Sequence, residues 1–264
     1  MSYTQKHESA VVTHDDIVAG LHQLGLPAGS SVLVHSSLKS FGYVDGGAPT
    51  VVRALLTVLG PKGTLLVPTF PFRGTQYSYL KSNPVFDVRN TPSLVGVITE
   101  TVRQWPSARR SLHPDHPVAA IGALAEDMLA HHERIPTCCG LGSPFMRNVF
   151  NDGYILLLGV DNRRNTTLHA VEEAEDPDIF SSDTFIPTVI DWRGRSLTVP
   201  VRAYAENRSR NFPVVEEPLK AAGIMRMGRI GDAAVRLIAA QPMYKLVSEM
   251  LCHNRRALLA DTAS

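Results

Sequence analysis

Cysteine, surplus charge and long apolar runs are all scarce in this sequence of 264 residues. Only Cys138, Cys139 and Cys252 carry thiols, and no two of them have the CxxC spacing, so neither a disulfide framework nor a thiol-based metal site is indicated. The 26 Lys and Arg residues nearly balance the 25 Asp and Glu residues, which argues against a general nucleic-acid or membrane-surface binder. No apolar stretch approaches a membrane span, and the first residues lack a signal-peptide core. We therefore expect a cytoplasmic protein whose partners are neither nucleic acids nor membranes.

Several short cofactor and catalytic motifs are missing as well. The sequence contains no P-loop, no GxGxxG and no GxSxG, so nucleotide binding through those loops and a simple serine-hydrolase mechanism are unsupported. Two histidine pairs are present, His113 with His116 around Pro114, and His131 with His132. Zinc sites need more ligands than either pair supplies. We expect no metal.

What is present is an alternation of short apolar runs with stretches of helical periodicity, which is typical of an α/β fold. Thr13 is a predicted N-cap and Gly25 a predicted stop for the first helix. Further helices are predicted over residues 48–59, 93–105, 123–131 and 145–150, and buried strands over residues 31–35, 64–67, 118–121 and 154–158. Residues 70–92 form a long loop rich in Pro, Gly and aromatics, which favours a functional role.

The last third of the chain has a different pattern. Residues 185–190 and 196–201 flank a turn and predict a β-hairpin. A charged stretch over 202–210 then precedes a C-terminus that we predict to be helical, most clearly over 230–237 and 244–259. We predict a flexible segment over 1–12. Residues 13–264 are predicted to form one three-layer α/β/α domain around a mostly parallel or mixed sheet, with the hairpin and C-terminal helices appended.

The most informative segment runs from Gly153 to Glu172. An unbroken apolar run ends in Gly159, and a polar loop leads to a helix for which Asn165 or Thr166 is a plausible N-cap. His169 and Glu172 then share one helical face at i, i+3 spacing. The C-terminal end of a buried strand is the usual place for catalysis in an open α/β sheet. The alternative is a surface ion pair, which is common at this spacing.

Two other strands end in polar residues. His35, Ser36 and Ser37 follow the first strand, and Thr69 follows the second. Each motif taken alone is also consistent with an ordinary turn whose hydroxyls satisfy the backbone. Because parallel strands present their C-terminal ends at one edge of a sheet, we predict that these residues and His169 meet in one crevice.

Several motifs, taken in chain order, resemble those of a known family: Val34-His-Ser-Ser-Leu38, Gly60-Pro-Lys-Gly-Thr-Leu-Leu-Val-Pro-Thr69, Arg110-Ser-Leu-His-Pro114, Gly142-Ser-Pro144, and Leu157-Leu-Gly-Val160 with Asn165-Thr-Thr-Leu-His-Ala-Val-Glu172. The set is similar to the aminoglycoside 3-N-acetyltransferases, antibiotic acetyltransferases that lie outside the common GNAT fold. The resemblance covers about residues 15–175 and is looser over 211–259.

The resemblance implies an α/β/α sandwich that uses acetyl-coenzyme A to acetylate a primary amine of an antibiotic or antibiotic-like molecule. It also implies that His169 and Glu172 are catalytic and that Thr69 lies beside them. His169 suits the role of base for direct attack of the amine on the thioester, because its unperturbed pKa lies near 6.5. Glu172 would orient the imidazole, and Thr69 would stabilise the oxyanion or relay a proton to the thiolate. The candidate cofactor-binding residues are His35, Ser36, Ser37, Arg110 and Ser111.

The acceptor and the role stay open at this point. Arg163 and Arg164 stand where the family usually carries a Gly-His-Asp-like loop, and Pro117 stands where it tends to have a small hydroxyl residue. The two arginines would disfavour a polycationic acceptor, and we predict that they bind an anionic amine bearing phosphate, phosphonate or carboxylate, or else the cofactor's own phosphates. A catalytically silent coenzyme A-binding relative and an acyl or amide hydrolase are the alternatives from other classes. A homodimer is an open option.

Overall fold

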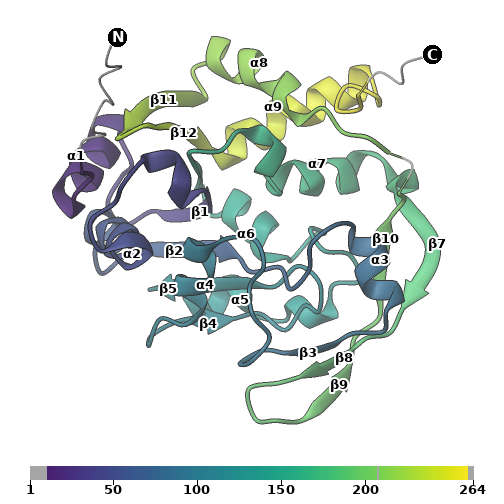
Figure 1. The fold of residues 1–264 in the computed structure, drawn as a ribbon. Coiled ribbons are helices and arrows are strands. Elements are labelled where there is room, and N and C mark those ends of the chain that lie inside the picture. Colours follow the sequence, from purple (N-terminus) through teal and green to yellow (C-terminus); the bar gives the residue numbers. More distant parts are fainter. Residues whose placement is uncertain (1–10, 207, 261–264) are drawn as a thin grey trace, which may run out of the picture.

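The fold is built on a mixed seven-stranded sheet, which the computed structural model describes within residues 11–206 and 208–260 (Figure 1). Three central strands are parallel: β6 (Tyr154–Leu158), β1 (Ser31–Ser36) and β2 (Thr64–Pro68). The flanking strands run antiparallel to their neighbours: β12 (Ala233–Ala239) and β11 (Met225–Ile230) beyond β6, and β5 (Val118–Gly122) and β4 (Arg109–Arg110) beyond β2. The sheet is therefore mixed, and its parallel part is confined to the centre.

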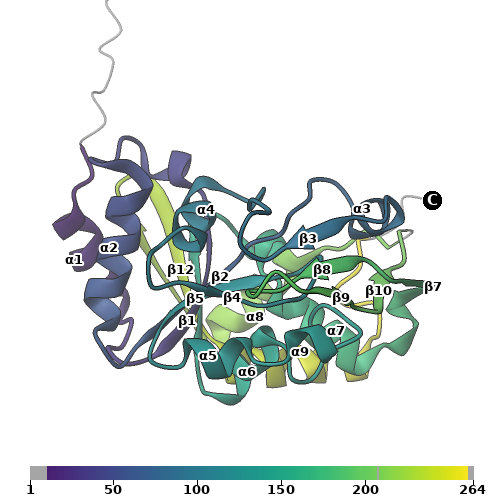
Figure 2. The same cartoon turned by 90° about the horizontal axis from the view of Figure 1, so that it is seen from below.

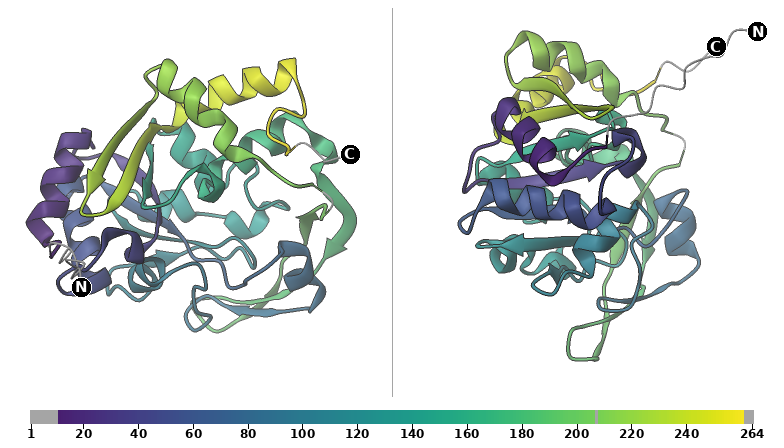
Figure 3. Two further views of the ribbon diagram at one scale, coloured as in Figure 1. Left: turned by 45° about the horizontal axis from the view of Figure 1, so that its top comes forward. Right: turned by 60° about the vertical axis from the view of Figure 1, so that its left-hand side comes forward.

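Helices cover both faces of this sheet, as Figures 2 and 3 show. One layer contains α1 (His14–Leu24), α2 (Gly47–Leu59) and α4 (Val97–Arg103), and the other contains α5 (Ala125–Leu129), α6 (Pro144–Phe150), α7 (Thr167–Glu175) and α9 (Ala240–His253). A short helix, α8 (Glu216–Ala221), contacts β11. The predicted three-layer α/β/α sandwich is confirmed.

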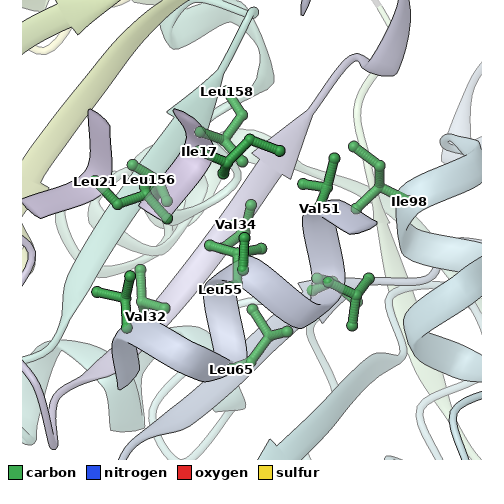
Figure 4. Close-up of a cluster of buried hydrophobic side chains, with 14 of the residues drawn as sticks. Ile17, Leu21, Val32, Val34, Val51, Leu55, Leu65, Ile98, Leu156 and Leu158 are labelled. Carbon is green, nitrogen blue, oxygen red and sulfur yellow. The ribbon is translucent and has the colours of Figure 1, made fainter. Parts of the chain in front are cut away.

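The alternation of side chains along the central strands explains the two layers. Val32 and Val34 point into one hydrophobic cluster with residues of α1 and α2 (Figure 4), whereas Leu33 between them packs in a different cluster with Phe145 of α6. Because successive side chains of a strand face opposite sides of its sheet, a strand that is apolar throughout needs a helical layer on each side. The unbroken apolar runs in the sequence predicted this arrangement correctly.

The ends of α1 follow the sequence signals closely. The side chain of Thr13 accepts a hydrogen bond from the backbone of Asp16, whose carboxylate accepts one in return from the backbone of Thr13. At the other end, Gly25 adopts φ +78°, a left-handed conformation that costs glycine little. Both predicted caps are confirmed, and Ile17, Leu21 and Leu24 are buried as the helical period requires.

Smaller elements lie on the side of the molecule opposite to α1 (Figure 1). They comprise α3 (Gln76–Lys81), a sheet of β3 (Val85–Asp87), β8 (Thr188–Ile190) and β9 (Ser196–Thr198), and a pair of strands, β7 (Phe180–Phe185) and β10 (Val201–Tyr204). The predicted hairpin is present as β8 and β9, which pair antiparallel. The long loop predicted over 70–92 carries α3 and β3.

The predicted helix over 230–237 is wrong. These residues lie in a hairpin in which β11 turns at Gly231 into β12, and β12 pairs with β6. Ile230, Ala233 and Leu237 fit a helical period, but Ala233, Val235 and Leu237 also alternate as a strand requires. Pairing with β6 buries Val235 and Leu237 and decides in favour of the strand. The last predicted helix is displaced, because α9 begins at Ala240 and ends at His253.

The N-terminal segment was predicted to be flexible over 1–12, and most of that prediction falls outside the described residues. Val12 is buried, and its backbone N–H donates to the carbonyl of Tyr43 at 2.8 Å. Among the described helices, none is long and apolar enough to cross a membrane.

Candidate active site

A cleft with a volume of about 1040 Å³ opens where β1, β2 and β6 end. Its walls come from the segments that follow β1, β2, β6 and β10 and from the start of α4. His35, Ser36 and Ser37 lie on one of these segments, and His169 lies on another. The structure thus brings together the polar ends of two strands, as the sequence predicted.

His169 is held by a carboxylate one helical turn further along α7. Its Nδ1 lies 2.7 Å from Oε2 of Glu172, and the side chains are 20% and 5% exposed. The pair is therefore partly buried, with His169 in the cleft wall and Glu172 behind it, and the surface ion pair considered above does not describe it. Arg210, which follows β10, donates through Nε to both carboxylate oxygens of Glu172 at 2.8 and 3.1 Å. Glu172 thus has two cationic or potentially cationic partners.

These contacts set the charge of the site. Burial lowers the pKa of His169, and Arg210 and His116 lower it further, against the opposing effect of Glu172. Burial alone would raise the pKa of Glu172, but the hydrogen bond with His169 and the charge of Arg210 lower it below its ordinary value. At neutral pH, the site therefore contains a neutral imidazole beside an ionised carboxylate.

Aromatic side chains fix the plane of the imidazole. Tyr204 stacks on His169 with ring centroids 4.8 Å apart and planes inclined by 25°, and Phe212 packs edge-on at 4.8 Å. The Tyr204 hydroxyl donates to Oε1 of Glu173 at 2.6 Å, so the stacking ring is itself anchored. On the opposite face of α7, Leu168 and Val171 are completely buried and fix the helix against the core. The imidazole consequently has little rotational freedom.

Besides Glu172, three predicted site residues do not line the cleft. Thr69 is fully buried, and its hydroxyl donates to the carbonyl of Pro117 at 3.0 Å and accepts from Nε of Arg110 at 2.9 Å. Arg110 is also buried and donates to the carbonyls of Thr69 and Thr91. The hydroxyl of Ser111 is bonded to the backbone N–H of Val118 and lies 3.0 Å from His132. The polar atoms of these three side chains are thus engaged within the protein.

The end of β1 contrasts with this arrangement. Nε2 of His35 and Oγ of Ser36 are buried without a hydrogen-bond partner among the described residues, although both residues line the cleft. Burial and the charge of Arg164 lower the pKa of His35 to about 3. Arg163 and Arg164 also line the cleft, and Arg163 is 71% exposed and paired with Asp161 at 2.6 Å. This wall therefore offers unpaired polar atoms together with positive charge.

Comparison with known proteins agrees with the resemblance that the motifs indicated. A family model described as aminoglycoside 3-N-acetyltransferase matches residues 33–252. The chain belongs to that family. Aminoglycoside N(3)-acetyltransferase IX of Micromonospora chalcea is 30% identical over an alignment that covers 90% of this chain and 92% of that protein. The resemblance inferred from the motifs is confirmed, and the chain is an N-acetyltransferase.

Solved structures of aminoglycoside 3-N-acetyltransferases have the same fold. Aminoglycoside acetyltransferase AAC(3)-Xa is 31% identical with a TM-score of 0.80, and the match covers 94% of each chain. A mutant of aminoglycoside acetyltransferase AAC(3)-IVa in complex with a gentamicin is 26% identical with a TM-score of 0.83, over 97% of this chain and 94% of that one. The similarity thus extends beyond the segments that carried the motifs.

Sequence reasoning missed several residues in the cleft of this acetyltransferase. Arg210 was included only as the last residue of the charged stretch over 202–210, and Tyr204 was not singled out. His116 was considered only as half of a zinc pair, yet it lines the cleft. Glu206 is the one acidic side chain among the described lining residues. The charged stretch over 202–210, which follows a predicted strand, was the available signal for Arg210 and Glu206.

One group of side chains has the spacing of potential metal ligands. Cys138, Cys139 and Glu173 bring one ligand atom each within 4.8 Å of one another. Burial raises the pKa of both thiols, so they are neutral at ordinary pH. Glu173 already accepts hydrogen bonds from Thr137, Tyr204 and the backbone of Cys139. As described, the group is a hydrogen-bonded support beneath Tyr204.

Proposed function

We propose that this protein transfers the acetyl group of acetyl-coenzyme A to a primary amine of an aminoglycoside or a similar antibiotic-like molecule. The observation that carries the proposal is the imidazole of His169, held by Glu172 and Arg210 in the wall of the large cleft. The names of the family and of its relatives support acetyl transfer, and the neighbour in complex with a gentamicin supports an aminoglycoside acceptor.

The proposed base is Nε2 of His169. Because ionised Glu172 can only accept hydrogen bonds, Nδ1 carries the proton that faces it, and Nε2 keeps its lone pair. None of the described residues forms a hydrogen bond with Nε2. The acceptor amine is mostly protonated near neutrality, so it must lose a proton to attack the thioester. A lowered pKa keeps His169 unprotonated and ready for this step, and Glu172 stabilises the imidazolium that forms.

The wall at the end of β1 fits the cosubstrate. Coenzyme A carries phosphates and amide groups, which require cations and hydrogen-bonding atoms. Positive charge there comes from Arg163, Arg164 and Lys39. The unpaired atoms of His35 and Ser36 are available for hydrogen bonds with the polar groups of the cosubstrate. Ser37 lies on the same wall. We assign the two arginines to the phosphates, since the named relatives favour a cationic acceptor over the anionic amine.

A thiol-release assay with acetyl-coenzyme A and a panel of amines tests the proposal. Amine-dependent release, with acetylated amine as product, is the expected result. Release without amine would identify a hydrolase, and binding without release would identify a silent relative. Direct attack through a ternary complex predicts intersecting initial-velocity lines, because both cysteines near the site are fully buried. Parallel lines would require a covalent acetyl-enzyme instead.

A further inference from the structure

A second histidine, His116, lines the same cleft as His169 and lies in a separate polar cluster. Its side chain is only 7% exposed and packs against Phe70, with ring centroids 4.2 Å apart, and against Phe72 at 5.7 Å. Its Nδ1 lies 3.4 Å from Oδ1 of Asp115. The ring is therefore fixed by two aromatic neighbours, and its Nδ1 faces the carboxylate as a charge contact without a hydrogen bond.

Asp115 is completely buried, and no guanidinium lies within ion-pair distance of it in the part of the chain that the structure describes. Nδ1 of His113 lies 2.6 Å from its Oδ1, and Nε2 of Gln76 donates to its Oδ2. Burial opposes ionisation of Asp115, but the charges of His113 and His116 hold the pKa of this carboxyl well below its usual range. A buried carboxylate of this kind requires a compensating positive charge.

His116 contributes to that charge together with His113, which lies nearer to Asp115. Burial lowers the pKa of His116, but the negative charges that face it, Cys138 when ionised and Asp115, raise the pKa above its ordinary value. The pKa of Cys138 is itself raised well above its ordinary value by burial, so this thiol is neutral near pH 7 and Asp115 is the negative charge that remains. The surroundings of the two cleft histidines therefore shift their pKa values in opposite directions.

One step of acetyl transfer, the protonation of the departing thiolate, has no residue assigned to it so far. When the amine attacks, the C–N bond forms and the C–S bond breaks, and the departing thiolate needs a proton or a hydrogen-bond donor. Thr69, the residue predicted for this role, points its hydroxyl at the carbonyl of Pro117. His169 is occupied with the proton of the amine. A proton donor in the cleft wall is therefore required. His116 lines the cleft, and it immediately precedes Pro117, whose carbonyl accepts from Thr69.

We propose that His116 is the general acid of the reaction, and that it donates its Nε2 proton to the sulfur of the departing thiol while His169 takes the proton of the amine. The inference rests on the proposed function. The protons of this step balance. The thiol leaves with the proton of His116, His169 holds the proton of the amine, and the two histidines return to their starting states by exchange with water. Two titratable groups whose environments drive their pKa values apart are the usual arrangement for paired acid–base catalysis.

A purely structural role for His116, as counter-charge to Asp115, is the alternative that an experiment must separate. We use two acetyl thioesters without the nucleotide: S-acetyl-N-acetylcysteamine, an alkyl thioester, and S-acetyl thiophenol, an aryl thioester. The aryl thiolate is a stable leaving group and needs no proton, whereas the alkyl thiolate does. A structural defect lowers both rates by the same factor, and loss of a general acid does not.

We expect His116→Asn to lower kcat/KM for the alkyl thioester by about 10²-fold or more, and for the aryl thioester by less than about tenfold. The ratio of the two rates does not depend on the fraction of folded enzyme. An unchanged ratio in a variant that still transfers acetyl overturns the inference and leaves the proposed function standing. If the wild-type enzyme transfers acetyl to no amine, the inference and the proposed function are both overturned.

Two further measurements do not depend on that variant. With wild-type enzyme and a series of thioesters, general acid catalysis predicts a shallow dependence of kcat/KM on the pKa of the leaving thiol, and a steep dependence overturns it. Asp115→Asn removes the charge that raises the pKa of His116, so the alkaline limb of kcat should move to lower pH. The charged or titratable groups that face His116 are Asp115, Cys138, His113, His132 and His169. Of these, only Asp115 changes in the variant.

Discussion

Two histidines share the cleft, each beside a carboxylate, and their pKa values are shifted in opposite directions. His169 is 2.7 Å from Glu172, yet its pKa is lowered. His116 is 3.4 Å from Asp115, a longer contact, yet its pKa is raised to about 10. The distance to the carboxylate therefore does not decide whether an imidazole is protonated.

The third partner decides it. Arg210 donates twice to Glu172, and its positive charge offsets part of the effect by which the carboxylate raises the pKa of His169. Asp115 has an amide and imidazoles as partners, and no guanidinium lies within ion-pair distance of it among the described residues. In a site of low polarity each buried charge needs one counter-charge. At Glu172, Arg210 is that counter-charge, and at Asp115 the charges of His113 and His116 take its place.

The largest effect is expected when the neutral imidazole is removed. His169→Ala should lower kcat by about 10²-fold or more, because no other described group is placed to take the proton of the amine. The KM for acetyl-coenzyme A should change little. Steady-state kinetics with an aminoglycoside acceptor measures both, and His22→Ala, an exposed histidine of α1, is the control. Turnover near that of the wild type across the pH range would contradict the mechanism.

Changing the partners of His169 should shift its pKa in opposite directions. Glu172→Gln removes a charge that raises this pKa, so the acid limb of kcat/KM should move to lower pH by about 1 unit or more. Arg210→Gln removes a charge that lowers it, so the limb should move to higher pH. Both variants should retain more activity than His169→Ala. Shifts of the same sign in pH–rate profiles would show that the two partners do not act through the imidazole.

Substitution of Thr69 tests whether this residue, which lies behind the cleft wall, takes part in the reaction. Thr69→Val removes the acceptor of Nε of buried Arg110, so the free energy of unfolding should fall by about 1–3 kcal/mol. We expect kcat to change by less than about tenfold. Denaturant unfolding and kinetics measure the two effects, with Thr184→Val on the exposed face of β7 as control. A loss of kcat comparable to that of His169→Ala would restore Thr69 to the catalytic group.

The smallest effect is expected at the arginine pair. Arg163→Ala with Arg164→Ala should raise the KM for acetyl-coenzyme A roughly fivefold, equivalent to about 1 kcal/mol, whichever acceptor is used. Arg164 should account for most of it, because Arg163 is already paired with Asp161. Arg109→Ala, an exposed cation outside the cleft, is the control. A loss confined to anionic amines would instead favour the anionic acceptor.

The His169 site was largely predictable and the His116 site was not. A buried strand and an i, i+3 pair lie within 20 residues of sequence, so local rules place His169 and Glu172 after the end of β6. The predicted cap is not formed, because Thr166 at the N-cap of α7 makes no capping hydrogen bond with its side chain. Arg210 and Tyr204 reach the same imidazole from a distant segment, and nothing local indicates that contact. The motif Arg110–Pro114, which ends two residues before His116, was recognised, but the direction of its side chains was not, and Thr69 and Arg110 bind each other.

Local pattern determined the strands β1, β2, β5 and β6, the caps of α1, the three layers and the pairing of His169 with Glu172, because each depends on the period of neighbouring residues and on steric rules within one turn. Tertiary structure decided whether residues 230–237 became a strand, because β6 offered an unpaired edge. It also decided which polar groups reached the cleft and which charge each histidine carries. Those outcomes depend on partners far away in sequence, since burial and electrostatic energy are set by what lies nearby in space.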